Sequence, residues 1–89
     1  MEAMVWSGTG LLPDHLEIIR LTTLDDGRWQ AHCQYDAGST RTLHFAPGDA
    51  GRSQVAGALR TQLGFGSNDA EETARRLFEP FDMAADWPW

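Results

Sequence analysis

The segment Arg28–Tyr35, R-W-Q-A-H-C-Q-Y, decides the fold, because it predicts the strand on which the rest of the chain is built. Its apolar residues alternate with polar ones without a break, which is typical of a β-strand with one buried face. A turn signal stands at each end, D-D-G at residues 25–27 and D-A-G-S at residues 36–39. The segment should therefore be the middle strand of an antiparallel meander.

The neighbouring strands are expected at Leu16–Leu24 and Thr40–Phe45, which are rich in β-branched and apolar residues. In the first of these segments the apolar residues occupy both parities. This irregularity predicts a β-bulge near Ile18 and Ile19, or partial cover on both faces.

The register of the three strands follows from keeping the apolar side chains on one face. A three-residue loop at residues 25–27 would place Ile19 and Leu21 on the same face as Cys33 and Ala31. For the second hairpin we expect three opposite pairs: Leu43 with Cys33, Phe45 with Ala31, and His44 with His32.

Two helices should follow the sheet. The first is expected to start between Asp49 and Ser53, either of which can cap it, and to run to about Leu63. Gly57 lies inside this helix and weakens it by roughly 1 kcal/mol relative to alanine. Close packing against the sheet would explain a small residue there.

The second helix is expected from Asp69 to Phe78. Asn68 and Glu71 have the spacing of a capping box, and Pro80 should end the helix. Its acids and arginines recur at i,i+4 in the favourable order, which is typical of a solvent-exposed face.

The predicted architecture is α+β: a three-stranded antiparallel meander, with room for a fourth short strand at residues 3–6, and two helices packed on one face. We expect a single domain over residues 1–81 and an acidic aromatic tail over residues 82–89. The predicted core consists of Ile19, Leu21, Trp29, Ala31, Cys33, Leu43, Phe45, Val55, Leu59, Ala74, Leu77 and Phe78.

The chain carries 13 acids against seven arginines and no lysine, a net charge of −6. This balance argues against a general nucleic-acid binder, which needs a cationic field to attract phosphates. It suits instead a basic protein surface, for example on a complex that handles nucleic acid. The use of arginine without lysine is typical of a GC-rich bacterial or phage genome.

No pattern predicts a catalytic, cofactor-binding or metal-binding site, so we expect no enzymatic activity. Cys33 has inward parity in its strand and lacks the spacing of a zinc site. His15, His32 and His44 leave open an alternative, a small metal-binding or regulatory domain. The N-terminus has no export signal and there is no 18-residue apolar run, so a cytoplasmic location is expected.

The function that we expect is therefore protein binding, as an inhibitor or adaptor of phage or mobile-element type, for example one that resembles anti-CRISPR proteins. Six acids of the second helix and tail outnumber its two arginines. The predicted partner-binding residues are Glu71, Glu72, Glu79, Asp82, Asp86, Trp87 and Trp89.

The last four residues, Asp86-Trp87-Pro88-Trp89, resemble the C-terminal tip of bacterial single-stranded-DNA-binding proteins. That tip ends in aspartates followed by Ile-Pro-Phe and docks into small basic pockets on replication and repair proteins. The resemblance implies a second alternative, a docking module that uses its Trp-Pro-Trp tail. Ala84 and Ala85 stand where the family has further acids, and both tryptophans are larger than the residues they replace. Packing of the two tryptophans on the sheet is the structural alternative.

Overall fold

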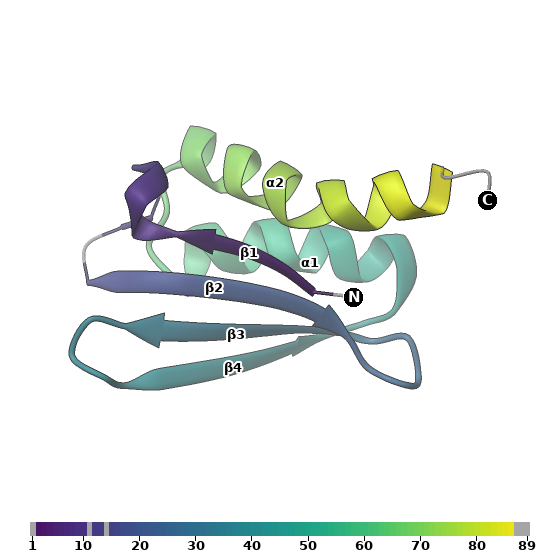
Figure 1. The fold of residues 1–89 in the computed structure, drawn as a ribbon, viewed down its shortest axis with the longest axis horizontal. Helices are drawn as coiled ribbons and strands as arrows, with labels where there is room; N and C mark the ends of the chain where they lie inside the picture. Colours follow the sequence, from purple (N-terminus) through teal and green to yellow (C-terminus); the bar gives the residue numbers. More distant parts are fainter. Residues whose placement is uncertain (1, 11, 14, 87–89) are drawn as a thin grey trace.

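The computed structural model describes residues 2–10, 12–13 and 15–86. Four strands form one antiparallel sheet in the order β1-β2-β3-β4. A short 3-10 turn, η1, follows β1, and the two helices lie together on one face of the sheet (Figure 1). The bounds are β1 Glu2–Trp6, η1 Ser7–Thr9, β2 Leu16–Thr23, β3 Trp29–Tyr35, β4 Thr40–Phe45, α1 Gly48–Thr61 and α2 Ser67–Asp86. The predicted α+β fold is confirmed, and the fourth N-terminal strand is present.

The first hairpin has the predicted register. The N–H of Leu24 donates to the carbonyl of Arg28 at 2.8 Å, and Gly27 has a φ of 88°, which closes a three-residue loop. Ile19 consequently lies opposite Cys33 and Leu21 opposite Ala31. The predicted irregularity in β2 falls between Leu16 and Ile18.

The predicted register of the second hairpin is wrong by two residues. Leu43 lies opposite Ala31, and Phe45 lies opposite Trp29. The physical reason is the turn, because the N–H of Tyr35 donates to the carbonyl of Ser39 at 2.9 Å and the loop begins one residue earlier than expected. A shift of two residues leaves every side chain on its predicted face.

The core forms between the sheet and the helices and contains every predicted residue. Leu43 alone is half-buried, since it lies on the edge strand; the others are buried. Sequence reasoning missed part of the core, namely Ala3, Val5, Leu16, Ala58, Leu63, Phe65, Ala70 and Thr73.

The predicted cap of α1 is wrong. The helix begins at Gly48, directly after Pro47, and no side chain caps its first turn. Gly48 adopts a φ of 72°, which lets the chain turn sharply out of the sheet. Asp49 therefore lies within the first turn, where its negative charge favours the helix N-terminus without capping it.

The glycine that allows close packing is Gly51, not Gly57. A Cβ atom on Gly51 would lie 1.7 Å from the carbonyl oxygen of Ala46 and 2.5 Å from Cδ1 of Trp29. A Cβ atom on Gly57 would meet nothing within 4 Å. The backbone of α1 thus approaches the end of the sheet most closely at Gly51.

The predicted bounds of α2 are also wrong. The N–H of Ala70 donates to the carbonyl of Gly66 at 2.8 Å, so the helix begins before Asn68. Pro80 lies inside the helix, which continues to Asp86 although proline removes one backbone hydrogen bond. The helix runs through residue 82, where the tail was expected to begin, and the boundary between domain and tail stays a prediction. Trp87 and Trp89 lie outside the described residues.

The two glycines of α1 make a matched test of the packing. Gly51→Ala should lower the free energy of unfolding by about 1–3 kcal/mol, because the new methyl group overlaps Ala46 and Trp29. Gly57→Ala should raise it by up to about 1 kcal/mol through helix propensity. Urea unfolding measures both changes, and equal effects of the two variants would contradict the close approach at Gly51.

Candidate functional site

An open groove of about 420 Å³ lies between α1 and α2. Ala74 and Phe78 are buried and Ala56 is half-buried, so the bottom of the groove is apolar. Charged side chains stand around it. The lining residues are Arg52, Ser53 and Ala56 from α1, and Glu71, Ala74, Arg75, Phe78 and Asp82 from α2.

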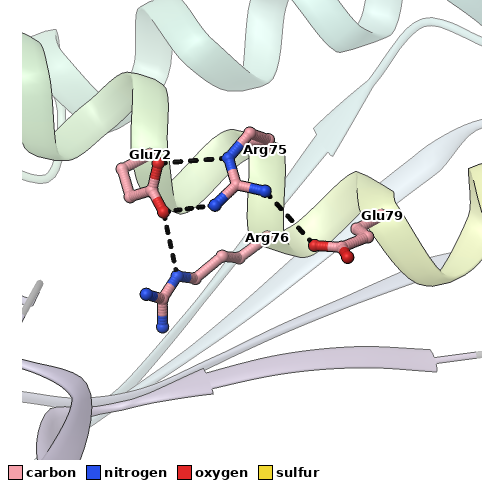
Figure 2. Close-up of polar contacts among 4 residues, drawn as sticks. All are labelled: Glu72, Arg75, Arg76 and Glu79. Carbon is pink, nitrogen blue, oxygen red and sulfur yellow. Dashed lines mark hydrogen bonds and ion pairs between the residues drawn. The ribbon is translucent and has the colours of Figure 1, made fainter.

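Beside the groove, Glu72 joins two arginines of α2 in one ion-pair network (Figure 2). Nε of Arg75 donates to Oε2 of Glu72 at 3.1 Å, and Nε of Arg76 donates to Oε1 at 3.2 Å. Arg75 also reaches Glu79 at 3.4 Å. Hydrogen bonds from Arg75 and then Arg76 lower the pKa of Glu72 to about 2, so this carboxylate is charged at neutral pH.

At the other end of the groove, Arg52 holds the last turns of α2. Its guanidinium lies 4.7 Å from the centre of the Phe78 ring and 5.6 Å from that of Trp29. It also donates two hydrogen bonds to the carboxylate of Asp82. The hydrogen bond from Arg52 lowers the pKa of Asp82, and the same bond raises the pKa of Arg52.

Glu71 is the unpaired charge of the groove. Arg52 is neutralised by Asp82, and Arg75 by Glu72 and Glu79. Within the part of the chain that the structure describes, Glu71 makes no hydrogen bond or ion pair, and its side chain is exposed. The groove therefore combines an apolar bottom with a surplus negative charge at its rim.

The structure brings the predicted partner-binding residues together only in part. Glu71 and Asp82 line the groove, whereas Glu72 and Glu79 do not line it but pair with Arg75, which does. Asp86 is the final residue of α2. Trp87 and Trp89 lie outside the described residues, so docking of the Trp-Pro-Trp tail stays a prediction.

Sequence reasoning missed Arg52 and the apolar bottom of the groove. The spacing of Arg52 and Ala56 on α1 and of Ala74 and Phe78 on α2 places each pair on one helix face. That spacing was the available signal. Which face of α1 meets which face of α2 depends on tertiary packing, which local spacing does not contain.

The predicted histidine pair is wrong, because the register of the second hairpin is shifted. His32 lies opposite Thr42, with its Nδ1 at 3.1 Å from the Thr42 hydroxyl, and His44 lies opposite Gln30. His15 contacts Asp36 at 3.2 Å. Among the described residues, no three His, Cys, Asp or Glu side chains form a group that could hold a metal ion.

Cys33 is buried in the sheet, as its parity predicts. Burial raises the pKa of its thiol to about 11, far above the range of a reactive cysteine. At neutral pH the thiol is therefore protonated and serves as a small apolar core group.

Comparison of the chain with protein-family models, with curated proteins and with solved structures gave no significant match. Over residues 2–10, 12–13 and 15–86, neither helix is long and apolar enough to cross a membrane.

The pKa of Glu72 is directly measurable. Its carboxyl should titrate near pH 2 and not near the ordinary value of 4.5. Because the pKa is lowered on folding, the ion pairs stabilise the fold above pH 4.5, and this contribution is lost as the pH falls toward 2. Carboxyl-carbon NMR gives the titration.

The pH dependence of the unfolding free energy gives a second test of the Glu72 network. Glu72→Gln should flatten the decline of the unfolding free energy between pH 5 and pH 2, the window set by the lowered pKa of about 2. Glu17→Gln, which removes the same charge from β2, should leave the titration of Glu72 unchanged. Titration of Glu72 at its ordinary value would show that the network does not form in solution.

Proposed function

We propose that this protein is a small acidic binding module without enzymatic activity, which docks a basic protein surface against the groove between α1 and α2. One observation carries the proposal: Glu71 lines this groove without a partner in the described chain, while both arginines beside it are paired. The unpaired charge is the negative carboxylate of Glu71, so the complementary side chain of a partner is a cation.

The shape of the groove supports an arginine or lysine side chain as the group that enters it. Such side chains lay an apolar stem along apolar surface and keep the charged end at the rim. Ala56, Ala74 and Phe78 provide the surface for the stem, and Glu71 provides the charge. The fixed pairs of Arg52 and Arg75 limit their repulsion of an incoming cation.

The overall charge supports the same partner class. The protein has a net charge of −6, and its field attracts a basic surface at a rate that falls with salt. Proteins that handle nucleic acid present such surfaces, because they must attract phosphates. A small acidic domain placed there competes with the nucleic acid.

These properties define the role that we propose, an inhibitor or adaptor of the kind that phages and mobile elements encode, with anti-CRISPR proteins as one example. The proposed place of action is the cytoplasm. The bound surface would belong to a basic protein of a nucleic-acid-handling complex, and the domain itself would make no contact with nucleic acid.

Glu71→Gln tests the proposal, with Glu17→Gln as the matched control, because both variants remove one exposed acid. Titration of the full chain with an acetylated hexa-arginine peptide, followed by amide NMR, should shift residues around the groove. Glu71→Gln should weaken the affinity by up to about fivefold, since a partly exposed ion pair contributes up to about 1 kcal/mol. Glu17→Gln should retain the groove shifts.

Two results would contradict the proposal. One is that the peptide shifts the amide signals of all acidic segments equally, which would indicate attraction by the overall charge and no specific site. The other is equal weakening by the two variants. Capture from a bacterial lysate extends the test to natural partners: a basic protein retained at low salt by the native chain should be retained less by Glu71→Gln than by Glu17→Gln.

A further inference from the structure

The free edge of β4 has backbone groups without partners among the residues that the structure describes. The hydrogen bond from Tyr35 to Ser39 sets the alternation of the hairpin, so Arg41, Leu43 and Phe45 direct their backbone groups toward β3. Thr40, Thr42 and His44 direct theirs outward. β4 pairs with β3 alone, and no described residue makes a further backbone hydrogen bond to these three.

Ala46, the next residue in the series of Thr40, Thr42 and His44, also directs its backbone N–H away from β3. The N–H of Ala46 donates to Oε1 of Gln54 on α1, at 2.9 Å. A side chain of α1 thus satisfies the outward backbone group just after β4 ends. The same helix lies beside His44, the preceding outward residue.

A groove of about 390 Å³ runs between this edge and α1. Its lining residues are His44, Phe45, Gln54, Gly57, Ala58, Thr61 and Gln62. Gly57 opens the groove, because a Cβ atom there would meet nothing within 4 Å. Glycine lowers the intrinsic stability of the helix at this position, although no close packing requires glycine there.

Of the features that prevent strand pairing, this edge lacks lysine, proline and bulges. The sequence of β4, T-R-T-L-H-F, contains no lysine or proline, and its pairing with β3 is regular. Its one arginine, Arg41, donates to the backbone carbonyl and the side-chain oxygen of Gln62, at 3.1 and 2.9 Å. At the opposite edge, α2 packs against β1, whereas β4 borders the sheet on the side away from α2 (Figure 1).

We propose that this edge and groove bind an extended peptide of another protein, which adds to the sheet as a fifth strand beside β4. Thr42 and His44 supply the backbone hydrogen bonds, and Gly57 leaves room for side chains that face α1. The chemistry of the peptide follows from the lining, which contains no acid and lies next to Arg41. A neutral or acidic segment fits, in contrast to the basic side chain proposed for the groove between α1 and α2.

A second copy of this chain fits the edge less well. Each copy would carry a net charge of −6, so the mutual repulsion of two copies opposes their association far more than the charge of a short peptide does. The occupant of the β4 edge is therefore a peptide of another protein, and dimerisation through β4 would contradict this.

The test uses the full chain and a capped octapeptide, T-V-E-V-T-V-E-V, as the probe. In amide NMR the peptide should saturably shift Thr42, His44 and the α1 residues of the groove, with cross-strand contacts between peptide amides and Thr42. Gly57→Leu should weaken binding at least tenfold by filling the groove. Gly66→Leu adds the same side chain just before α2, at an exposed glycine where a Cβ atom would also meet nothing within 4 Å, and should leave binding unchanged.

Thr42→Pro removes one outward N–H and should also abolish binding. If Thr42→Pro does not fold, Gly57→Leu still tests the proposal. No saturable shifts at millimolar peptide would overturn the proposal. So would binding that Gly57→Leu leaves intact, or sedimentation equilibrium showing a dimer that Thr42→Pro dissociates. The hexa-arginine response should survive Gly57→Leu, so this proposal and the proposed function fail separately.

Discussion

The packing of Trp29 is the contact on which the rest of the structure depends. Its indole N–H donates to the carbonyl of Gly48 at 3.1 Å and so fixes the first turn of α1. Its ring meets Phe78 and Phe81 edge to face, with centres 5.0 Å apart in both cases. A residue at the start of β3 therefore positions both helices, and geometry of this kind adds to the free energy gained by burying the rings.

The candidate site follows from the same contact. Gly51 lets α1 approach Trp29 closely enough for Arg52 to lie over the rings of Trp29 and Phe78. There Arg52 meets Asp82, which α2 presents only because the helix continues past Pro80. Because Arg52 and Arg75 both pair with other acids, Glu71 has no partner at the groove among the described residues.

Much of the fold could be predicted from the sequence, because strand periodicity fixes which residues face the core. The pairing of the second hairpin was predictable as well, because Gly38 adopts a φ of 89° at the third position of loop 36–38, as Gly27 does with a φ of 88° in the first hairpin. The continuation of α2 past Pro80 was not predictable, because it depends on the contact of Phe81 with Trp29, which lies 52 positions away in sequence. In the site, i,i+4 spacing places Glu72 near Arg76, but nothing local pairs Arg52 with Asp82.

Amide hydrogen exchange tests most directly whether Trp29 holds α2 in place beyond Pro80. In the native chain, the amides of residues 82–86 should be protected to a degree similar to those of residues 74–78. Trp29→Phe, which removes the hydrogen bond to Gly48 and shrinks the ring, should lower protection at residues 82–86 more than at 74–78. Free exchange beyond residue 81 in the native chain, or a uniform loss in the variant, would contradict the account.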